Sequence, residues 1–321
     1  MRDRTTSSQT TAWVRLHRAR SYLVWACVIV MRSSFASSQD VVDAARGKDC
    51  LTSGCHSDMT EASQVHDPIA KNDCNQCHTL SDAKAHKFAL PKSGSRMCLT
   101  CHAAIAEEIQ NKNLHHHAPV QTGACLTCHD PHSSTETPLL RSSSNDLCLT
   151  CHGDMATAKM KTPHQPFAEK TCDACHSSHA APHADLLIES YPREFYGTYD
   201  EDRFSLCFSC HDEELVSEAE TSEDTMFRNG DINLHHLHVA RNAKGRSCRI
   251  CHTPHGGHQD RLIRSGVSYG TAGWMLKMEY RATENGGSCG PACHAPKRYD
   301  REVPVDQCKP IAWPLMGDSK P

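Results

Sequence analysis

The chain has 321 residues, of which 6 % are aromatic, and a formal net charge of -4. A chain of this length normally buries a sizeable apolar core, but a mean hydropathy of -0.57 indicates too few apolar side chains to build one. The basic residues are scattered along the chain, which argues against a nucleic-acid partner. A composition this polar ordinarily predicts disorder unless something other than side chains organises the fold.

Residues 1–36 differ from the rest of the chain. A basic stretch precedes an apolar run at residues 22–31, and Ser34-Phe35-Ala36 then provides a cleavage site of small residues. This order is typical of a secretory signal peptide. The apolar run is too short for a bilayer span, which needs about 20 residues, so we expect no transmembrane helix in the mature chain. We expect cleavage to remove Cys27, and the mature protein to lie in the periplasm, with outer-membrane association or an extracellular location as further options.

Eighteen of the twenty cysteines form nine close pairs, and histidine follows the second cysteine of every pair. In a c-type cytochrome two thiols add to the haem vinyl groups, and the adjacent imidazole becomes the proximal iron ligand. Seven pairs have the spacing CxxCH: Cys74, Cys77 and His78; Cys98, Cys101 and His102; Cys125, Cys128 and His129; Cys148, Cys151 and His152; Cys172, Cys175 and His176; Cys207, Cys210 and His211; and Cys248, Cys251 and His252. Two are stretched, namely Cys50, Cys55 and His56, and Cys289, Cys293 and His294. Extra residues enlarge the covalent ring without separating the second cysteine from its histidine, so we predict about nine haem c groups.

Two other uses of paired cysteines explain the pattern less well. Zinc ribbons contain CxxC elements but do not require a histidine after each pair. A disulfide framework suits a secreted chain, yet cysteines so close together are poor staples and the histidines would be unexplained. Bound haems would instead supply the apolar surface that the side chains lack. We therefore predict a mostly irregular fold with short α-helices, built from tandem two-haem repeats wrapped around a haem chain.

The motifs recur with a regular cadence beyond the signal peptide. A first motif is followed by a turn with a further histidine, a Leu-Leu segment and a second motif, as at residues 125–132, 138–140 and 146–152. After the second motif, residues 103–112, 154–161 and 212–220 look helical, and Ile105 and Ile109 would turn one apolar face toward a haem. The predicted segments are a signal peptide (1–36), a single-haem segment (37–70), haem pairs at 71–113, 114–162, 163–230 and 231–300, and a tail (301–321).

Fourteen histidines remain as candidates for the second, distal iron ligand. Three of them stand eight residues before a first cysteine and one stands ten residues before it, whereas others follow a first motif within a few residues. These periodic candidates are His66, His86, His117, His132, His164, His179, His238 and His255. The ninth ligand is open among His115, His116, His183, His235, His236 and His258. Methionine could compete as a ligand, but the surplus of histidines makes it unnecessary.

Three further features have two interpretations each. The aromatic-rich residues 191–199 could pack on haem faces or dock a partner, and packing is favoured. The acidic residues 212–224 are expected to form a solvated face. Cys308 in the tail is expected to be a spare thiol, with dimerisation as the weaker alternative.

The cadence resembles the doubled-CxxCH family of multihaem c-type cytochromes, in which CxxCHxPH, a Leu-Leu segment and a second CxxCH recur in tandem. The resemblance covers roughly residues 50–300, and His132, His179 and His255 match the family's CxxCHxPH histidine, with Ser178 where proline is usual. It implies electron transfer in the periplasm or inside an outer-membrane porin, with redox proteins, a porin or other cytochromes as partners.

Function depends on whether both axial positions of every iron are filled. If they are, no position is vacant for a substrate, and the protein moves electrons without catalytic residues. The alternative is a multihaem reductase of nitrite, hydroxylamine or a sulfur oxyanion with one open haem, although the CxxCK motif of nitrite reductases is absent. A subunit of an extracellular haem filament or a porin plug would also transfer electrons.

Overall fold

The computed structural model describes residues 50–51, 55–91, 94–157 and 159–306. The predicted signal peptide, Cys27 and Cys308 lie outside the described residues. The chain divides into two compact units, one formed by residues 1–57 and 68–91 and the other by residues 58–67 and 92–321. No helix in the described ranges is long and apolar enough to cross a membrane.

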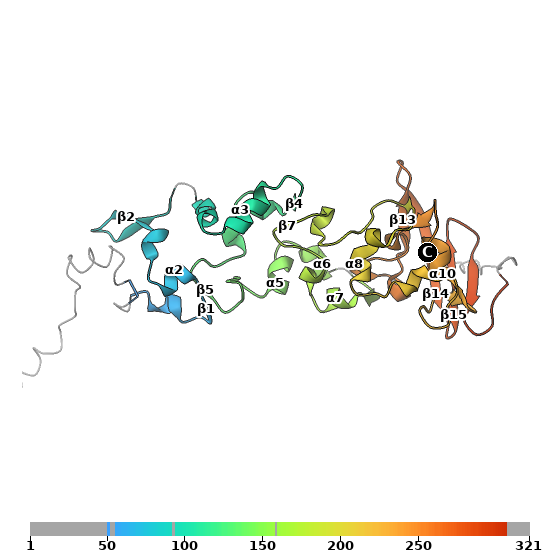
Figure 1. Ribbon diagram of the computed structural model, residues 1–321. Helices are drawn as coiled ribbons and strands as arrows, with labels where there is room; N and C mark the ends of the chain where they lie inside the picture. Colours follow the sequence, from blue (N-terminus) through green and yellow to red (C-terminus); the bar gives the residue numbers. More distant parts are fainter. Residues whose placement is uncertain (1–49, 52–54, 92–93, 158, 307–321) are drawn as a thin grey trace, which may run out of the picture. The chain divides into compact units, whose positions relative to one another are not determined.

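The helices are short and are joined by irregular stretches (Figure 1), as the sequence predicts. The α-helices are α2 (Asp67–Ala70), α3 (Ala103–Gln110), α4 (Ala118–Gln121), α5 (Ser144–Leu149), α6 (Gly153–Thr157), α7 (Gln165–Ala168), α8 (Ser205–Phe208), α9 (Glu214–Ser217) and α10 (Leu234–Val239). The 3-10 turns are η1 (Ser57–Thr60), η2 (Cys74–Gln76), η3 (Gly94–Thr100), η4 (Cys125–Thr127), η5 (Cys172–Ala174), η6 (Ala184–Leu186), η7 (Glu201–Phe204), η8 (Cys248–Ile250) and η9 (Asp260–Leu262).

The helices after the second motifs are shorter than predicted. Helix α3 ends at Gln110, before Asn111, a residue with low helix propensity. Helix α6 covers Gly153–Thr157, and Thr162 and Pro163 lie in a two-residue strand. Residues Ile105 and Ile109 are half-buried on α3.

Most strands are two-residue antiparallel ladders that join distant parts of the chain. In the larger unit they pair β1 (Gln64–Val65) with β5 (Ser133–Ser134), β4 (His115–His116) with β7 (Ala180–Ala181), β6 (Thr162–Pro163) with β12 (Gly256–Gly257), β8 (Tyr196–Gly197) with β11 (Gly245–Arg246), and β9 (Arg228–Asn229) with β10 (Ile232–Asn233). In the smaller unit β2 (Thr79–Asp82) pairs with β3 (Lys87–Ala89).

A four-stranded antiparallel sheet near the C-terminus departs from the predicted irregular fold. It contains β13 (Gly266–Tyr269), β14 (Trp274–Ala282), β15 (Gly286–Pro291) and β16 (Lys297–Asp300), in that order. The turn between β13 and β14 places Gly270 and Gly273 at φ +71° and +67°, where glycine avoids the steric cost that other residues pay. The aromatic and aliphatic residues of β13 and β14, bounded by glycines, are the sequence signal of this hairpin.

The side-chain cores of the larger unit are small and flank one motif. Phe204, Val216 and Val239 form a buried cluster that contacts Cys248. A second cluster, built around Ile250 and Met278, contacts Cys251. Both clusters therefore pack against the motif that begins at Cys248.

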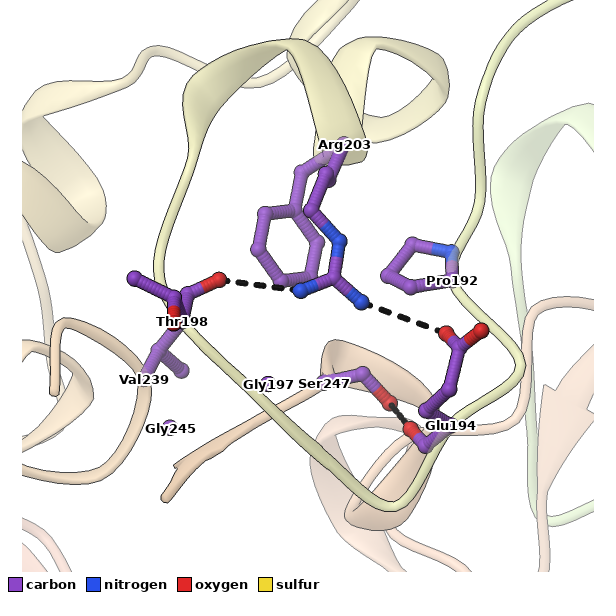
Figure 2. A pocket seen from close by; sticks show the side chains of 9 residues that line it. Pro192, Glu194, Gly197, Thr198, Arg203, Val239, Gly245 and Ser247 are labelled. Carbon is purple, nitrogen blue, oxygen red and sulfur yellow. Dashed lines mark hydrogen bonds and ion pairs between the residues drawn. The ribbon is translucent and has the colours of Figure 1, made fainter. Parts of the chain in front are cut away.

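The aromatic residues of the segment 191–199 are half-buried and contact other aromatic rings of the protein. Phe195 contacts Tyr269 edge-on, with ring centroids 5.0 Å apart, and Tyr199 stacks on Phe204. Figure 2 shows how this segment is fastened: the guanidinium of Arg203 donates to Thr198 O at 3.0 Å and to a carboxylate oxygen of Glu194 at 3.2 Å. The Ser247 hydroxyl donates to the backbone carbonyl of Glu194 at 3.2 Å, directly before Cys248.

Candidate haem sites

Each of the seven regular motifs forms the same single turn. In every case the histidine amide donates to the carbonyl of the first cysteine, at 2.9–3.0 Å. This bond closes one helical turn, so the two thiols and the imidazole keep one fixed arrangement. All eighteen motif cysteines, each within the described residues, are thiols that form no disulfide. The disulfide alternative is thus not realised, and the thiols can form thioether bonds to haem vinyl groups.

The two motifs of a pair differ in how far their second thiol is exposed. The second cysteine of the first motif is half-buried in all four pairs, namely Cys77, Cys128, Cys175 and Cys251. The second cysteine of the second motif is exposed in all four, namely Cys101, Cys151, Cys210 and Cys293, and so is Cys55 of the leading stretched motif. The first motif of each pair therefore holds its thioether position deeper in the polypeptide than the second.

The stretched motif near the C-terminus has a different backbone. The amide of His294 bonds to Pro291 O at 3.3 Å, and Cys289 lies in β15, opposite Tyr280 of β14. The extra residue of this motif therefore belongs to the end of a strand. In the other stretched motif, which runs from Cys50 to Cys55, residues 52–54 lie outside the described residues.

Eight motif histidines face a histidine from outside the motifs. The pairs and their ring-centroid distances are His56–His86 (6.2 Å), His102–His66 (6.1 Å), His129–His179 (6.1 Å), His152–His117 (6.4 Å), His176–His255 (6.2 Å), His211–His164 (6.2 Å), His252–His235 (6.4 Å) and His294–His238 (6.4 Å). Two metal–imidazole bonds of about 2 Å each would separate ring centroids by about 6 Å. The narrow range of distances therefore fits one metal ion held between two imidazoles at each pair.

Seven of the eight periodic candidates take part in these pairs. The structure places His132, the eighth, in the turn equivalent to those of His179 and His255, with Nδ1 3.9 Å from an Asp130 carboxylate oxygen. His78 contacts Phe88 edge-on at 6.4 Å.

Among the histidines whose role the sequence leaves open, the structure pairs His235 with His252. Its neighbour His236 instead directs Nδ1 at Val216 O, at 2.9 Å. His116 directs Nε2 at Glu108 O, also at 2.9 Å.

Short β-ladders join three histidines that precede a first motif, the leading histidines, to histidines that follow a first motif, the trailing histidines. The backbone amides of His66, His117 and His164 donate to the carbonyls of His132, His179 and His255, at 2.9, 3.0 and 3.0 Å. We call each such pair of segments a clasp: β1 with β5, β4 with β7, and β6 with β12. Within each clasp the Nδ1 of the leading histidine lies 2.8–3.0 Å from the carbonyl of the residue before the trailing histidine. A carbonyl can only accept, so this Nδ1 carries the proton and Nε2 is left to bind a metal.

The leading histidines also share a sequence signal that the cysteine spacing does not reveal. Each begins an H-x-P triplet, at residues 66–68, 117–119 and 164–166, and a helix follows directly. Proline fits the first turn of a helix because its fixed φ is helical and its missing N–H has no partner there. The triplet therefore sets where the helix begins and holds the histidine just before it.

The Leu-Leu segments orient the first histidine of three pairs. The Nδ1 atoms of His129, His176 and His252 donate to the carbonyls of Pro138, Asp185 and Arg261, at 3.0, 2.8 and 2.9 Å. These segments hold the non-glycine residues Leu139, Asp185, Leu186, Arg261 and Leu262 at φ between +58° and +61°. Such backbone costs about 1–3 kcal/mol per residue. We infer that the strained backbone is kept because it aims a carbonyl at the proximal imidazole.

Comparison with known proteins finds similarity to multihaem cytochromes. The doubled CXXCH motif model matches residues 66–107, 117–157 and 164–215. The chain is also 27% identical over 247 residues to the multihaem cytochrome MtrA of Shewanella baltica (strain OS185), across 71% of this chain and 68% of that relative. These stretches carry the doubled CXXCH motif, and the two comparisons together support a multihaem c-type cytochrome. Its CXXCH motifs bind haem c, and its role is electron transport.

Burial keeps several ring nitrogens of this cytochrome unprotonated. It lowers the pKa of His235 to about 3, and it lowers the pKa values of His252, His238, His179 and His255 as well. These imidazoles are therefore neutral near pH 7, and the neutral form is the one that binds a metal.

Consecutive motifs of the cytochrome from Cys125 onward are neighbours in space. Burial and then the nearby Cys172 thiol raise the pKa of Cys148, and the neighbouring thiols of Cys207 and Cys248 shift each other's pKa in opposite directions. Burial and then the nearby Cys151 thiol raise the pKa of Cys128. Burial and then Cys210 do the same for Cys175, and Cys293 contributes in the same direction at Cys251. The sites therefore follow one another in sequence order over this part of the chain.

Proposed function

We propose that this cytochrome carries electrons along a chain of nine haems, each held between two histidines. The observation that carries the proposal is the set of eight imidazole pairs with nearly equal ring spacing. Haem, when bound, supplies an iron that gains and loses one electron. The cysteines of each motif attach the haem, the motif histidine is the proximal ligand, and the paired histidine is the distal ligand.

The repeat supports the same role for His132. It occupies the position of His179 and His255 after a first motif, and the β1–β5 clasp holds it as the other clasps hold those two. With His132 included, the distal ligands number nine: His66, His86, His117, His132, His164, His179, His235, His238 and His255. In the repeats that begin at Cys125 and Cys172, the two-haem unit is thus one pair of motifs together with one clasp.

Filled axial positions favour electron transfer over catalysis. An iron with an imidazole on each face has no position for a substrate, so the polypeptide's role is to attach, orient and shield. The hydrogen bonds from Nδ1 to carbonyls fix the tautomer and the ring orientation. The sequential order of the sites after Cys125 supports a linear route for electrons.

Export and partners belong to the same proposal. The signal-peptide pattern of residues 1–36 supports a mature protein in the periplasm. The partners would be redox proteins that exchange single electrons with exposed haem edges. The family resemblance supports another cytochrome or an outer-membrane porin as the docking partner.

The test is a redox titration combined with assays of substrate reduction. We expect nine one-electron equivalents per chain, and no catalytic oxidation of the reduced protein by nitrite, hydroxylamine or sulfite. Sustained turnover of any of these compounds by the purified protein would contradict the proposal and favour the reductase. The intact haem spectrum of the same sample verifies that the protein is fully loaded.

A further inference from the structure

The site formed by Cys248, Cys251, His252 and His235 differs from the others in its surroundings. The cluster of Phe204, Val216 and Val239 contacts Cys248, and the cluster around Ile250 and Met278 contacts Cys251. Elsewhere the motif cysteines lie outside the hydrophobic clusters that the described residues form. An apolar, low-dielectric surrounding disfavours the more charged ferric state of a haem iron.

The distal histidine of this site has an unusual hydrogen-bond partner. The Nδ1 atoms of His66, His117, His164 and His238 each lie within 3.0 Å of a backbone carbonyl. The Nδ1 of His235 instead lies 2.8 Å from the hydroxyl oxygen of Thr225, which is buried.

A hydroxyl is a weaker acceptor here than a carbonyl would be. The hydroxyl oxygen of Thr225 already accepts a bond from the amide of Phe227, at 3.0 Å. An imidazole that binds iron through Nε2 keeps its proton on Nδ1, so His235 must donate to Thr225. Strong acceptors at Nδ1 make a ligating imidazole more basic and stabilise ferric iron, whereas a weak acceptor does so less.

Two arginines add positive charge at the same site. The guanidinium groups of Arg246 and Arg264 lie near Cys251. Arg264 donates to His252 O at 3.1 Å. Its Nε is buried and has no hydrogen-bond partner in the part of the chain that the structure describes. This unpaired donor suits a carboxylate, such as a haem propionate, and positive charge beside a haem favours the ferrous state.

We propose that this site is the highest-potential site of the chain and that Thr225 and Arg264 are the residues that set its potential. The apolar clusters, the weak acceptor at His235 and the two arginines all act in the same direction. The inference rests on the proposed function in requiring a haem between His235 and His252. Under partial reduction the first electron would reside here, beside the C-terminal site of Cys289 and Cys293.

Two substitutions of Thr225 test its hydrogen bond with His235, because they should shift the reduction potential of the site differently. Thr225→Asn offers Nδ1 a carbonyl, as at His66, His117 and His164, and should move the highest-potential component of a spectroelectrochemical titration downward. A downward shift of about 59 mV in a one-electron reduction potential makes the ferrous-to-ferric ratio tenfold smaller at a fixed applied potential. Thr225→Val removes the acceptor and should move the same component upward or leave it in place. A downward shift in both variants would mean that Thr225 acts only through packing, and would overturn its assignment.

An arginine pair supplies the matched control. Arg264→Gln should lower the same component, whereas Arg141→Gln should leave it unchanged, because Arg141 occupies the equivalent repeat position and its Nε donates to Leu126 O at 2.7 Å. A highest-potential component that moves in neither Thr225→Asn nor Arg264→Gln would overturn the inference. The low-spin iron signal of each variant reports haem ligation separately. Absence of the low-spin signal from the unaltered protein would overturn the proposed function. Unshifted potentials in variants that keep the low-spin signal would overturn only this inference.

Discussion

His117 and His179 are joined by a backbone hydrogen bond of 3.0 Å, yet their rings face the histidines of two different motifs, His152 and His129. One of the two precedes the motif pair of residues 125–152 and the other follows it. The β4–β7 clasp therefore closes around a complete motif pair. The same arrangement recurs where His164 and His255 face His211 and His176.

A histidine in one predicted segment can face a motif of another segment. A substitution in one segment should therefore change a haem that is attached to another segment. His179 lies in residues 163–230 but faces His129 in residues 114–162. His179→Met should raise the potential of one haem, because thioether ligation favours ferrous iron. The control is His183→Met, four residues further on and outside the eight ring pairs. Magnetic circular dichroism should report one His/Met haem in the first variant and none in the second.

If the repeat correctly identifies His132 as a distal ligand, its replacement by methionine should also raise the potential of one haem. We expect His132→Met to retain all haems, because thioethers and proximal ligands are untouched, and to raise the potential of one haem. A raised site within a chain of haems should trap the electron and slow transfer between the chain's ends. His258→Met, at an exposed position, is the control. Unchanged titration and visible spectra in His132→Met would remove His132 from the ligand set.

Adjacent histidines on α10 provide a sharp test of the ring pairs. His235 faces His252, whereas His236 directs its Nδ1 at Val216 O. His235→Ala should convert one low-spin haem to high-spin or water-ligated iron, and His236→Ala should not. Electron paramagnetic resonance of the oxidised protein measures the difference directly. Equal high-spin signals in both variants would contradict the assignment of His235.

The cysteine spacing predicts where haems attach and which histidines are proximal, because covalent chemistry fixes these residues locally, and the seven regular motifs share one turn geometry. Periodicity also selected seven of the histidines that the structure places in ring pairs. It could not select His235, because His235 stands in neither of the repeated positions and α10 presents it three residues before His238. Likewise the β13–β16 sheet depends on pairing between strands, which haem-motif counting does not address.

The number of haems should be visible in the intact mass of the secreted protein. Nine motifs predict a mass above that of the mature polypeptide by nine haems. The double variant Cys289→Ala, Cys293→Ala should lose one haem and no more, because its thiols serve a single motif. A mass of seven haems in the unaltered protein would show that both stretched motifs are empty.

Spin state provides an independent prediction for the whole chain. Two imidazoles per iron predict six-coordinate, low-spin haem throughout, so the oxidised protein should show no substantial high-spin ferric signal. Adding cyanide or nitrite should leave the spectrum unchanged. One full equivalent of high-spin iron that responds to either anion would instead indicate an open site and a reductase.

Asn233 should be the residue whose loss disturbs two haem sites at once. Its side chain is 0 % exposed and caps α10, accepting from the amides of His235 and His236 at 2.9 and 3.1 Å. Its amide nitrogen donates to Leu215 O and Glu218 O, at 3.2 and 2.9 Å. Asn233→Ala removes a helix cap and leaves buried backbone groups unpaired, which should lower the free energy of unfolding by about 3 kcal/mol.

The spectroscopic effect of Asn233→Ala should distinguish Asn233 from a residue that only stabilises the fold. Because α10 carries both His235 and His238, a displaced helix should weaken ligation of the irons that His252 and His294 bind. High-spin signal should therefore appear for up to two irons in Asn233→Ala, and mild heating should increase it before the other haems change. Asn113→Ala, at an exposed position, is the control and should change stability by less than about 0.5 kcal/mol. A destabilised Asn233→Ala protein whose irons all remain low-spin until global unfolding would show that α10 does not hold the two distal ligands in place.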